Sequence, residues 1–485
     1  MKKIMFLLLC ASLKLIGQPE VYFNYATFNS PTKGPYIETY MSVVGKSLLF
    51  KKNTNNKFQG KMEVGILFLQ NEQIKASKKY ILNSSELDDT TNKPIILDQQ
   101  RFLLEPGAYE LEISRKDYNK PNSKVYVNKI PVKIYFPLDS VSISGIQFLE
   151  SYKKSEQQGE LTKNGLDMIP YVSDYFPDNM STIKFYTELY NTQKALGVDE
   201  KFLVYYYIES YEAQRILPDY SSFSKQVANV VNPVLAEFKI DKLPSGNYNL
   251  VVEVKNKNNE IILAKKQFFQ RHNPNVVPKI EDIAASTLIT KGSYFENLNS
   301  KDTLIAYIKS LKPIATGAEK SIAEKKLDGY DISILKQYFF NFWDTRNHTE
   351  PEKEWFAYHK QVLKVNHEFG TQTRRGYDTD RGRVYLQYGE PNQRSVVNSE
   401  SDTYPYEIWQ YYRINGQTNK KFVFYNPDLA SNNYQLIHSD TRGEVRNENW
   451  QVLLKKRNNM PFNLDTQNGS NNYGGNSDVL FKNPR

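Results

Sequence analysis

Two copies of one short signature limit the folds open to this chain more than any other feature. In the first copy, a Pro-Gly turn leads into an alternating segment with Tyr109, Leu111 and Ile113 on one face. The second copy, about 140 residues later, repeats the turn and the alternation through Tyr248 and Leu250. Because side chains alternate across a sheet, each copy predicts a tight turn followed by a half-buried strand. Two such units predict two β-domains in tandem.

Strand-like segments separated by polar turns surround both signatures. We expect one β-sandwich at 18–138 and a second at 139–272, because short strands at this spacing are typical of immunoglobulin-like sandwiches. In the second, the polar turn Asn256–Glu260 precedes a strand at Ile261–Phe269. The clearest predicted strands of the first are Tyr36–Val44, Ser47–Lys51, Lys61–Gln70 and Val125–Tyr135.

The pattern turns helical after the polar, proline-bearing stretch 270–278. A helical segment is expected at 273–345. Its predicted helices are Asp302–Leu311, Gly317–Leu327 and Ile332–Trp343. A further helix begins with a capping box at Thr349–Glu352 and ends before Gly370.

A C-terminal α+β domain is expected at 346–465. It combines the last of these helices with four predicted strands: Val384–Tyr388, Tyr406–Tyr412, Phe422–Tyr425 and Tyr434–His438. The tail, 466–485, is rich in Asn and Gly and is predicted to be disordered. The fold class is therefore multidomain β and α+β: two tandem sandwiches, a helical segment and a C-terminal α+β domain.

The N-terminus predicts export. Lys2 and Lys3 precede the apolar run Ile4–Leu13, and Gly17 offers a small residue for cleavage, which together indicate a signal peptide at 1–17. The run is shorter than the roughly 20 apolar residues that span a bilayer. We therefore expect no transmembrane segment after cleavage, and a location in the periplasm or at the outer membrane or cell surface.

Cys10 is the only cysteine and lies in the predicted signal peptide. Cleavage would leave a mature chain without disulfides, although exported proteins often carry them. A second interpretation makes Cys10 a lipidation site, but Leu9 before it is bulky where a small residue is expected. Ordinary cleavage is the favoured hypothesis.

The chain is basic, with a formal net charge of +9. Export argues against nucleic acid as the partner, so the charge favours an envelope protein or glycan, or it serves solubility alone. Peripheral membrane association is compatible with this composition. No cofactor is predicted.

One charged stretch contains all the candidate binding residues. It brings acids and arginines together between two glycines, and we call it the corner; its candidate binding residues are Arg375, Gly376, Tyr377, Asp378, Thr379, Asp380, Arg381, Gly382 and Arg383. The carboxylates suit turns and the arginines suit carboxylates or other anions. Two interpretations stay open. The corner is a salt-bridged structural element, or it recognises a carboxylate, phosphate or sugar.

Several segments resemble the GWxTD-domain family of exported, Bacteroidota-type proteins. The similarity covers about 331–450 closely and follows an ordered run of motifs: Phe342–Asn347, Asn366–Phe369, Gly376–Arg383, Tyr388–Pro391, Tyr406–Trp409, Phe422–Phe424 and Trp450. Tyr377 stands where the family has its eponymous tryptophan. The resemblance implies an envelope protein and brings no established activity.

Metal and catalytic interpretations are weaker. Asp378 and Asp380 are spaced like the start of a calcium loop, but Gly389 replaces its closing glutamate, so no metal site is predicted. His359 falls on an apolar helix stripe, which favours a packed histidine over a ligand. Glu390 and Glu407 are a candidate carboxylate pair for glycoside hydrolysis.

We expect a non-catalytic, exported binding or assembly protein. The competing hypothesis is a secreted hydrolase that acts on an envelope glycan or peptide, with the corner in its pocket.

Overall fold

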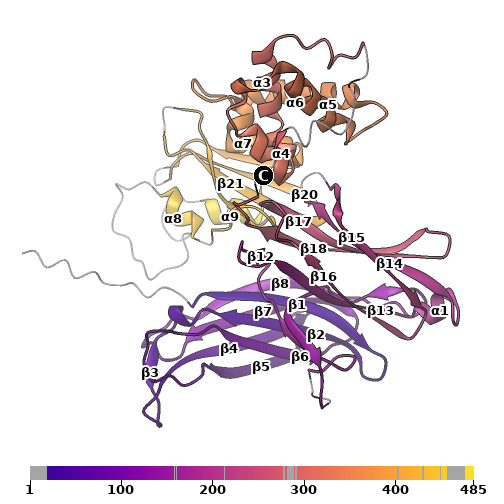
Figure 1. The fold of residues 1–485 in the computed structure, drawn as a ribbon. Coiled ribbons are helices and arrows are strands. Elements are labelled where there is room, and N and C mark those ends of the chain that lie inside the picture. The colour runs from indigo at the N-terminus through magenta and orange to yellow at the C-terminus, as the bar shows by residue number, and fades with distance from the viewer. Residues whose placement is uncertain are drawn as a thin grey trace, which may run out of the picture. The chain divides into compact units, whose positions relative to one another are not determined.

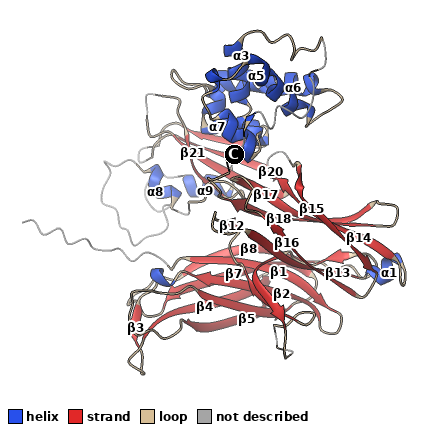
Figure 2. Ribbon diagram, in the orientation of Figure 1, coloured by secondary structure: helices blue, strands red, loops and turns tan. Residues whose placement is uncertain are grey.

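The computed structural model describes residues 19–157, 159, 161–211, 214–276, 279–280, 289, 292–400, 403–428, 431–447, 449–455 and 476–484. The predicted signal peptide, 1–17, lies outside these residues. Strands dominate the first half of the chain, and helices gather after residue 300 (Figure 2). The chain divides into two compact units. One runs to Tyr207 and includes Pro218–Asp241 and Leu250–Gln267; the other comprises Ile208–Leu217, Lys242–Asn249 and the chain from Phe268.

The first sandwich is built from two antiparallel sheets, drawn in indigo to violet in Figure 1. One sheet has the order β1–β2–β6, with β1 (Val21–Ser30), β2 (Gly34–Val43) and β6 (Ile96–Leu103). The other has the order β3–β4–β7–β8, with β5 also paired to β4; its strands are β3 (Phe50–Lys52), β4 (Phe58–Gln70), β5 (Gln73–Asn83), β7 (Gly107–Asp117) and β8 (Tyr126–Ile134). Phe68 and Phe102 meet between the sheets, with ring centroids 5.0 Å apart.

The second sandwich also pairs two sheets. The first has the order β11–β10–β13–β16, with β9 beside β13; these are β9 (Ser142–Ile143), β10 (Gln147–Lys154), β11 (Leu166–Pro170), β13 (Thr182–Tyr190) and β16 (Val231–Lys239). The second has the order β12–β18–β17–β14–β15, with β12 (Tyr175–Phe176), β14 (Lys201–Ser210), β15 (Ile216–Val227), β17 (Gly246–Lys255) and β18 (Ile261–Arg271). The short helix α1 (Thr192–Leu196) follows β13. Phe185 on β13 and Tyr206 on β14 are in edge contact, 5.6 Å apart, so aromatic rings fill the space between the sheets.

The repeated signature forms the same turn and the same tyrosine hydrogen bond in both sandwiches, although β7 alternates in burial whereas β17 is buried on both faces from Tyr248 to Val254. Tyr109, Leu111 and Ile113 are all buried on one face of β7, as predicted. The hydroxyl of Tyr109 donates to the carbonyl oxygen of Glu105 at 2.8 Å, and that of Tyr248 donates to Pro244 at 2.9 Å. Each tyrosine thus ties its strand to the turn four residues earlier. The tandem sandwich prediction is confirmed, while the domain boundaries stay predictions.

The helical part agrees with the predicted helices except in its caps and in the second helix, which ends at Ala323 rather than at Leu327. The helices are α3 (Lys301–Ser310), α4 (Gly317–Ala323), α5 (Ile332–Asp344), α6 (Pro351–Phe369) and α7 (Asp380–Tyr388), with 3-10 turns at Lys312–Ile314, Leu327–Gly329 and Gly376–Asp378. The capping box predicted at Thr349–Glu352 does not form, because the Glu352 carboxylate accepts the N–H of Tyr294 instead. A capping box is present at α4, between Thr316 and Glu319.

The last sheet has the antiparallel order β19–β20–β21–β22, with β19 (Gln393–Val397), β20 (Tyr406–Ile414), β21 (Gln417–Tyr425) and β22 (Gln435–Ser439). Val384–Tyr388, predicted as a strand, is instead the C-terminal part of α7, so that prediction is wrong. Thr379 caps this helix, and Gly389, with φ of 85°, ends it. Three of the four predicted strands of the domain are present.

Two short helices follow, α8 (Trp450–Leu454) and α9 (Ser477–Lys482). α9 lies in the segment predicted as a disordered tail. It forms because Phe481 packs against Trp450 and His438, at centroid distances of 5.2 and 5.4 Å. Within the described residues, no helix combines the length and apolar character needed to cross a membrane.

Candidate functional site

The corner is built on two close approaches between helices. A Cβ on Gly376 would lie 2.1 Å from the carbonyl oxygen of Val365 on α6. A Cβ on Gly382 would lie 1.9 Å from the carbonyl oxygen of Gly376. Both distances are far shorter than a van der Waals contact, so the two glycines are required by space. Together they let α7 pack directly against α6.

Thr379 starts α7 and fastens it to the preceding turn. Its side-chain oxygen accepts the N–H of Gly382 at 3.1 Å and donates to the carbonyl of Gly376 at 2.7 Å. Such a cap satisfies an N–H group that the first helical turn leaves unpaired. Thr379 is therefore explained by local structure.

The two aspartates of the corner have different partners. Asp378 forms an ion pair with Lys312, at 2.8 Å, and its carbonyl oxygen accepts from Arg374. The Asp380 carboxylate accepts the N–H of Leu436 at 2.8 Å and so joins α7 to β22. Neither carboxylate faces the other across a shared ligand position.

Arg381 is the buried centre of the corner. Its guanidinium donates to Glu407 at 2.6 Å and to the carbonyl oxygen of Asn432 at 2.8 Å. Glu407 also accepts from Arg394 at 2.9 Å and from the indole N–H of Trp409 at 2.8 Å. Burial lowers the pKa of Arg381, and the negative charge of Glu407 opposes that shift. The arrangement joins α7, β19 and β20 through one carboxylate.

Arg383, two residues further along α7, makes a second pair. Its two terminal nitrogens contact the two oxygens of Glu444, each at 2.7 Å. Tyr388 donates to the same carboxylate at 2.8 Å. Burial opposes the charge of Arg383, but Glu444 outweighs it and raises the pKa of the guanidinium. This bidentate geometry is the strongest form of an arginine–carboxylate contact.

Tyr377 and Arg375 complete the predicted set. Tyr377 is 8% exposed and belongs to the apolar core that α6 and α7 form with the sheet. Burial raises the pKa of its hydroxyl. Its aromatic ring therefore has a packing role in this core. Arg375 is exposed, immediately before the 3-10 turn.

A hollow lies beside the corner, between α6 and the end of α7. Its volume is about 290 Å³, and its lining residues are Tyr358, Gln361, Tyr385, Leu386, Gly389 and Glu390. Lys364 stands at its side and donates to the hydroxyl of Tyr385 at 2.8 Å and to Glu390 at 3.4 Å. This hollow offers the ammonium group of Lys364, the amide of Gln361, the carboxylate of Glu390 and the phenol of Tyr385, whereas the Tyr358 hydroxyl donates to the carbonyl of Ser310 at 2.7 Å. It suits a small polar ligand or a polar side chain.

Sequence reasoning singled out Glu390 and missed the rest of the hollow. The available signal was the spacing of Tyr358, Gln361 and Lys364, which places them one above another on a helix. It also missed Glu407 and Glu444 as the partners of Arg381 and Arg383. Those contacts span 26 and 61 residues, and no local pattern encodes them.

The two carboxylates proposed as a pair for hydrolysis lie in different environments. Glu407 is 2% exposed and is held by two arginines, whereas the Glu390 side chain is 70% exposed. His359 stacks on Trp355, with ring centroids 4.6 Å apart, and burial lowers its pKa. No group of three or more His, Cys, Asp or Glu side chains in the described ranges is placed to hold a metal ion.

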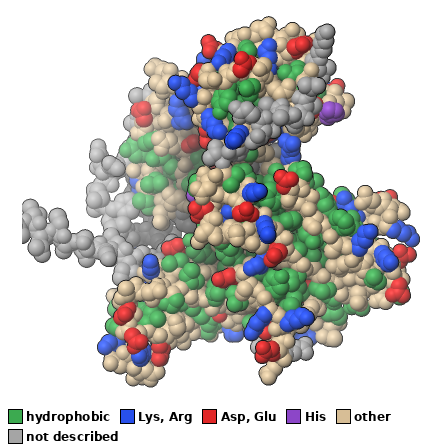
Figure 3. All heavy atoms as spheres, viewed as in Figure 1, with side chains coloured by type: hydrophobic (Ala, Val, Ile, Leu, Met, Phe, Trp, Pro, Cys, Tyr) green, Lys and Arg blue, Asp and Glu red, His purple; other side chains and the backbone are tan. Residues whose placement is uncertain are grey.

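The distribution of charged side chains on the surface shows where the basic charge of the chain lies. On the face drawn in Figure 3, Lys and Arg side chains are interspersed with Asp and Glu. Positive charge is not gathered into one patch on that face. The charge there fits solubility better than a polyanion site.

Comparison with known proteins identifies one family. The GWxTD domain family matches residues 282–456. No curated protein matches the chain. Among solved structures, fibronectin(III)-like modules of Clostridium thermocellum CbhA are 10% identical, with a TM-score of 0.15, over 50% of this chain and 89% of that one. A calcium-binding mutant of Bacteroides uniformis beta-glucuronidase 2 is 8% identical, with a TM-score of 0.17, over 50% of this chain and 27% of that one.

Neither structural match has a TM-score high enough to inform the fold or the chemistry. The family match covers the helices from α3 to α8, the corner, the hollow and the last sheet. The chain therefore contains a GWxTD domain at residues 282–456.

Proposed function

We propose that the protein is an exported, envelope-associated binding or assembly protein, and that its GWxTD domain binds an envelope protein or glycan through the hollow beside α7. One observation carries this proposal. The charged side chains of Asp378, Asp380, Arg381 and Arg383 are each engaged inside the domain, whereas the hollow presents polar groups at its rim. The corner is then the frame that holds α7, and the hollow is the recognition site.

The chemistry of the corner supports this division of roles. An anionic ligand at Arg381 or Arg383 would have to displace a buried carboxylate that is already paired. Removing one partner from a buried pair leaves an uncompensated charge, at a cost of several kcal/mol. A hydrolase centred on Asp378 and Asp380 would need carboxylates free to exchange protons, but both already hold donors.

A capture experiment tests the recognition site. Wild-type protein, a Glu390→Gln variant and a Gln361→Ala variant would be used to pull partners from the native envelope, with identification by mass spectrometry. Glu368→Gln, an exposed carboxylate elsewhere on α6, is the matched control. We expect a partner that the wild type and the control capture and that both hollow variants lose.

Two outcomes would contradict the proposal. Equal capture by all four proteins would remove the hollow from recognition. Turnover of a glycan or peptide library by the wild type, lost in Glu390→Gln, would replace binding with catalysis. Thermal melting of Asp380→Ala tests whether the corner is structural. A structural corner predicts a lower melting temperature, whereas a corner that serves only in binding predicts an unchanged melting temperature.

A further inference from the structure

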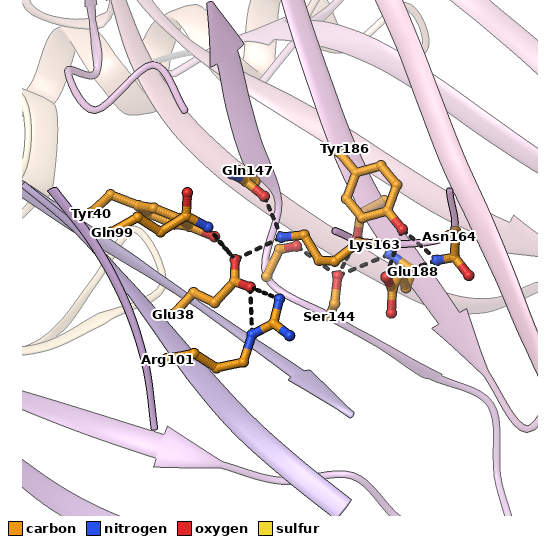
Figure 4. Close-up of polar contacts among 12 residues, drawn as sticks. Glu38, Tyr40, Gln99, Arg101, Ser144, Gln147, Lys163, Asn164, Tyr186 and Glu188 are labelled. Atoms are coloured by element: carbon orange, nitrogen blue, oxygen red, sulfur yellow. Dashed lines mark hydrogen bonds and ion pairs between the residues drawn. The ribbon is translucent and has the colours of Figure 1, made fainter. Parts of the chain in front are cut away.

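A buried polar cluster joins the two sandwiches within the first compact unit (Figure 4). Glu38, on β2 of the first sandwich, is fully buried. Lys163, between β10 and β11 of the second, donates to it at 2.7 Å and is itself only 5% exposed. Arg101, on β6, donates to the other oxygen of Glu38, with its Nε at 3.0 Å. We call this cluster the joint.

The joint continues into the second sandwich. Lys163 also donates to the amide oxygen of Gln147 at 2.7 Å. The Glu188 carboxylate, on β13, accepts from Asn164 at 3.0 Å and from the hydroxyl of Tyr186 at 2.6 Å. It is 4% exposed. Figure 4 shows these side chains converging on the space between the two sandwiches.

The charges of the joint balance. Two carboxylates, Glu38 and Glu188, stand with two cations, Lys163 and Arg101. The Lys163 ammonium also lies 3.9 Å from the centroid of Phe28, a favourable position for a desolvated cation. A buried charge is tolerated only when it is paired and hydrogen-bonded, so each member depends on the others.

The backbones around the joint approach closely. The N–H of Gly145 in the second sandwich donates to the carbonyl of Thr27 on β1 at 2.7 Å. A Cβ on Gly145 would lie 2.7 Å from the Cβ of Ala26. The N–H of Asn29 donates to the hydroxyl of Tyr190 at 3.0 Å. An apolar cluster that includes Phe28, Leu149 and Tyr186 spans the same contact. The two sandwiches thus meet through main-chain, apolar and ionic contacts together.

We propose that the joint is an electrostatic lock that selects one docking of the two sandwiches, so that they behave as a single rigid arm. Apolar surface alone would tolerate sliding, because its attraction is not directional. Any other alignment would leave Glu38 or Lys163 buried without its partner. The lock therefore works by penalising wrong alignments, which is how buried ion pairs contribute specificity more than net stability.

A double-mutant cycle on the full chain tests this lock. The variants are Glu38→Gln, Lys163→Met and the two combined, each melted thermally. Each single change leaves an unpaired buried group, and we expect the melting temperature to fall by roughly 10 °C. The double variant should recover part of that loss, because only Arg101 then lacks its carboxylate. Lys129→Met with Glu110→Gln, an exposed pair on the first sandwich, is the control and should change almost nothing.

A distance measurement separates a lock from an ordinary stabilising contact. Spin labels on cysteines introduced at Lys75 and Lys153, which are exposed on the first and second sandwich, report the alignment. The wild type should give one narrow distance distribution, and the double variant a broader one despite its partly recovered stability. Additive losses in the cycle would overturn the proposal, and so would a narrow distribution in the double variant. Should the single variants fail to fold, the double variant still decides between these outcomes.

Discussion

Glu38 and Glu407 make the same kind of contact in two different parts of the molecule. Each is a buried carboxylate that accepts hydrogen bonds from two cationic side chains. Glu407 closes contacts between neighbouring elements of one domain, and its partner Arg381 is 26 residues away. Glu38 joins the two sandwiches, and its partner Lys163 is 125 residues away.

The balance of charge also differs. In the joint, both cations pair with Glu38, and a second carboxylate, Glu188, lies close by and accepts from neutral donors (Figure 4). No second carboxylate accompanies Glu407, which faces Arg381 and Arg394. The excess cation is accommodated by the carbonyl of Asn432 and by the ring of Tyr434, 4.1 Å from the guanidinium carbon of Arg381. An arginine keeps its charge when buried, whereas a buried lysine loses its proton more readily unless carboxylates stabilise the charge. A domain interior can therefore hold an unbalanced cluster that the joint, with its lysine, does not show.

The largest expected effect tests the unbalanced cluster. Glu407→Gln leaves two arginines without their carboxylate, and we expect the free energy of unfolding to fall by about 3–5 kcal/mol. Denaturant unfolding monitored by tryptophan fluorescence measures it, because Trp409 loses the same acceptor. Glu368→Gln is the exposed control. A loss below about 1 kcal/mol would mean that aromatic rings and backbone carbonyls stabilise the two arginines without the carboxylate. Glu407 would then not have the structural role that Glu38 has.

Close approach is the second feature that the two regions share. Gly382→Ala would improve helix propensity by about 1 kcal/mol, yet the clash with the carbonyl of Gly376 should reverse the sign and destabilise by about 1–3 kcal/mol. Gly145→Ala should act similarly at the joint, against Ala26. Gly329→Ala, which has open space, is the control. A stabilised Gly382→Ala protein, in thermal or denaturant unfolding, would show that α7 can move away from α6.

The repeated signature should give equal, smaller effects in the two sandwiches. Tyr109→Phe and Tyr248→Phe each remove one hydroxyl that donates to the turn, and we expect a loss of about 1 kcal/mol in each. Tyr118→Phe, at an exposed ring, serves as the control. Denaturant unfolding of the three variants measures the losses. Clearly unequal losses would argue that the two signatures differ in structural role.

The smallest expected effect is a pH dependence confined to α6. Burial holds the pKa of His359 below its usual value of 6.5, so the unfolded chain binds the proton more readily. Stability from this group is present above pH 6.5 and is lost as the pH falls toward the lowered pKa. Melting temperatures between pH 7 and 5 should fall less in His359→Phe than in the wild type. His367→Gln, exposed on the same helix, should follow the wild type.

Regular periodicity was readable because it repeats within a few residues. The faces of β7 and β17 and the helices α3, α5 and α6 lie within a few residues of their predicted bounds. Val384–Tyr388 was misread because its alternating pattern is short, and the cap at Thr379 with the stop at Gly389 decides for a helix. The glycines of the corner provide space for close contacts with the backbone of Val365 and Gly376, which no local pattern predicts.

The sequence by itself determined the tandem sandwiches, most of the helices and the family to which the C-terminal part belongs. These follow from local alternation, helical spacing and an ordered run of motifs, all of which are properties of adjacent residues. Only the tertiary structure decided that Arg381 and Arg383 pair with Glu407 and Glu444, that the hollow forms beside α7, and that Glu38 meets Lys163. Those contacts join residues far apart in the chain, and only the packing of whole elements brings them together.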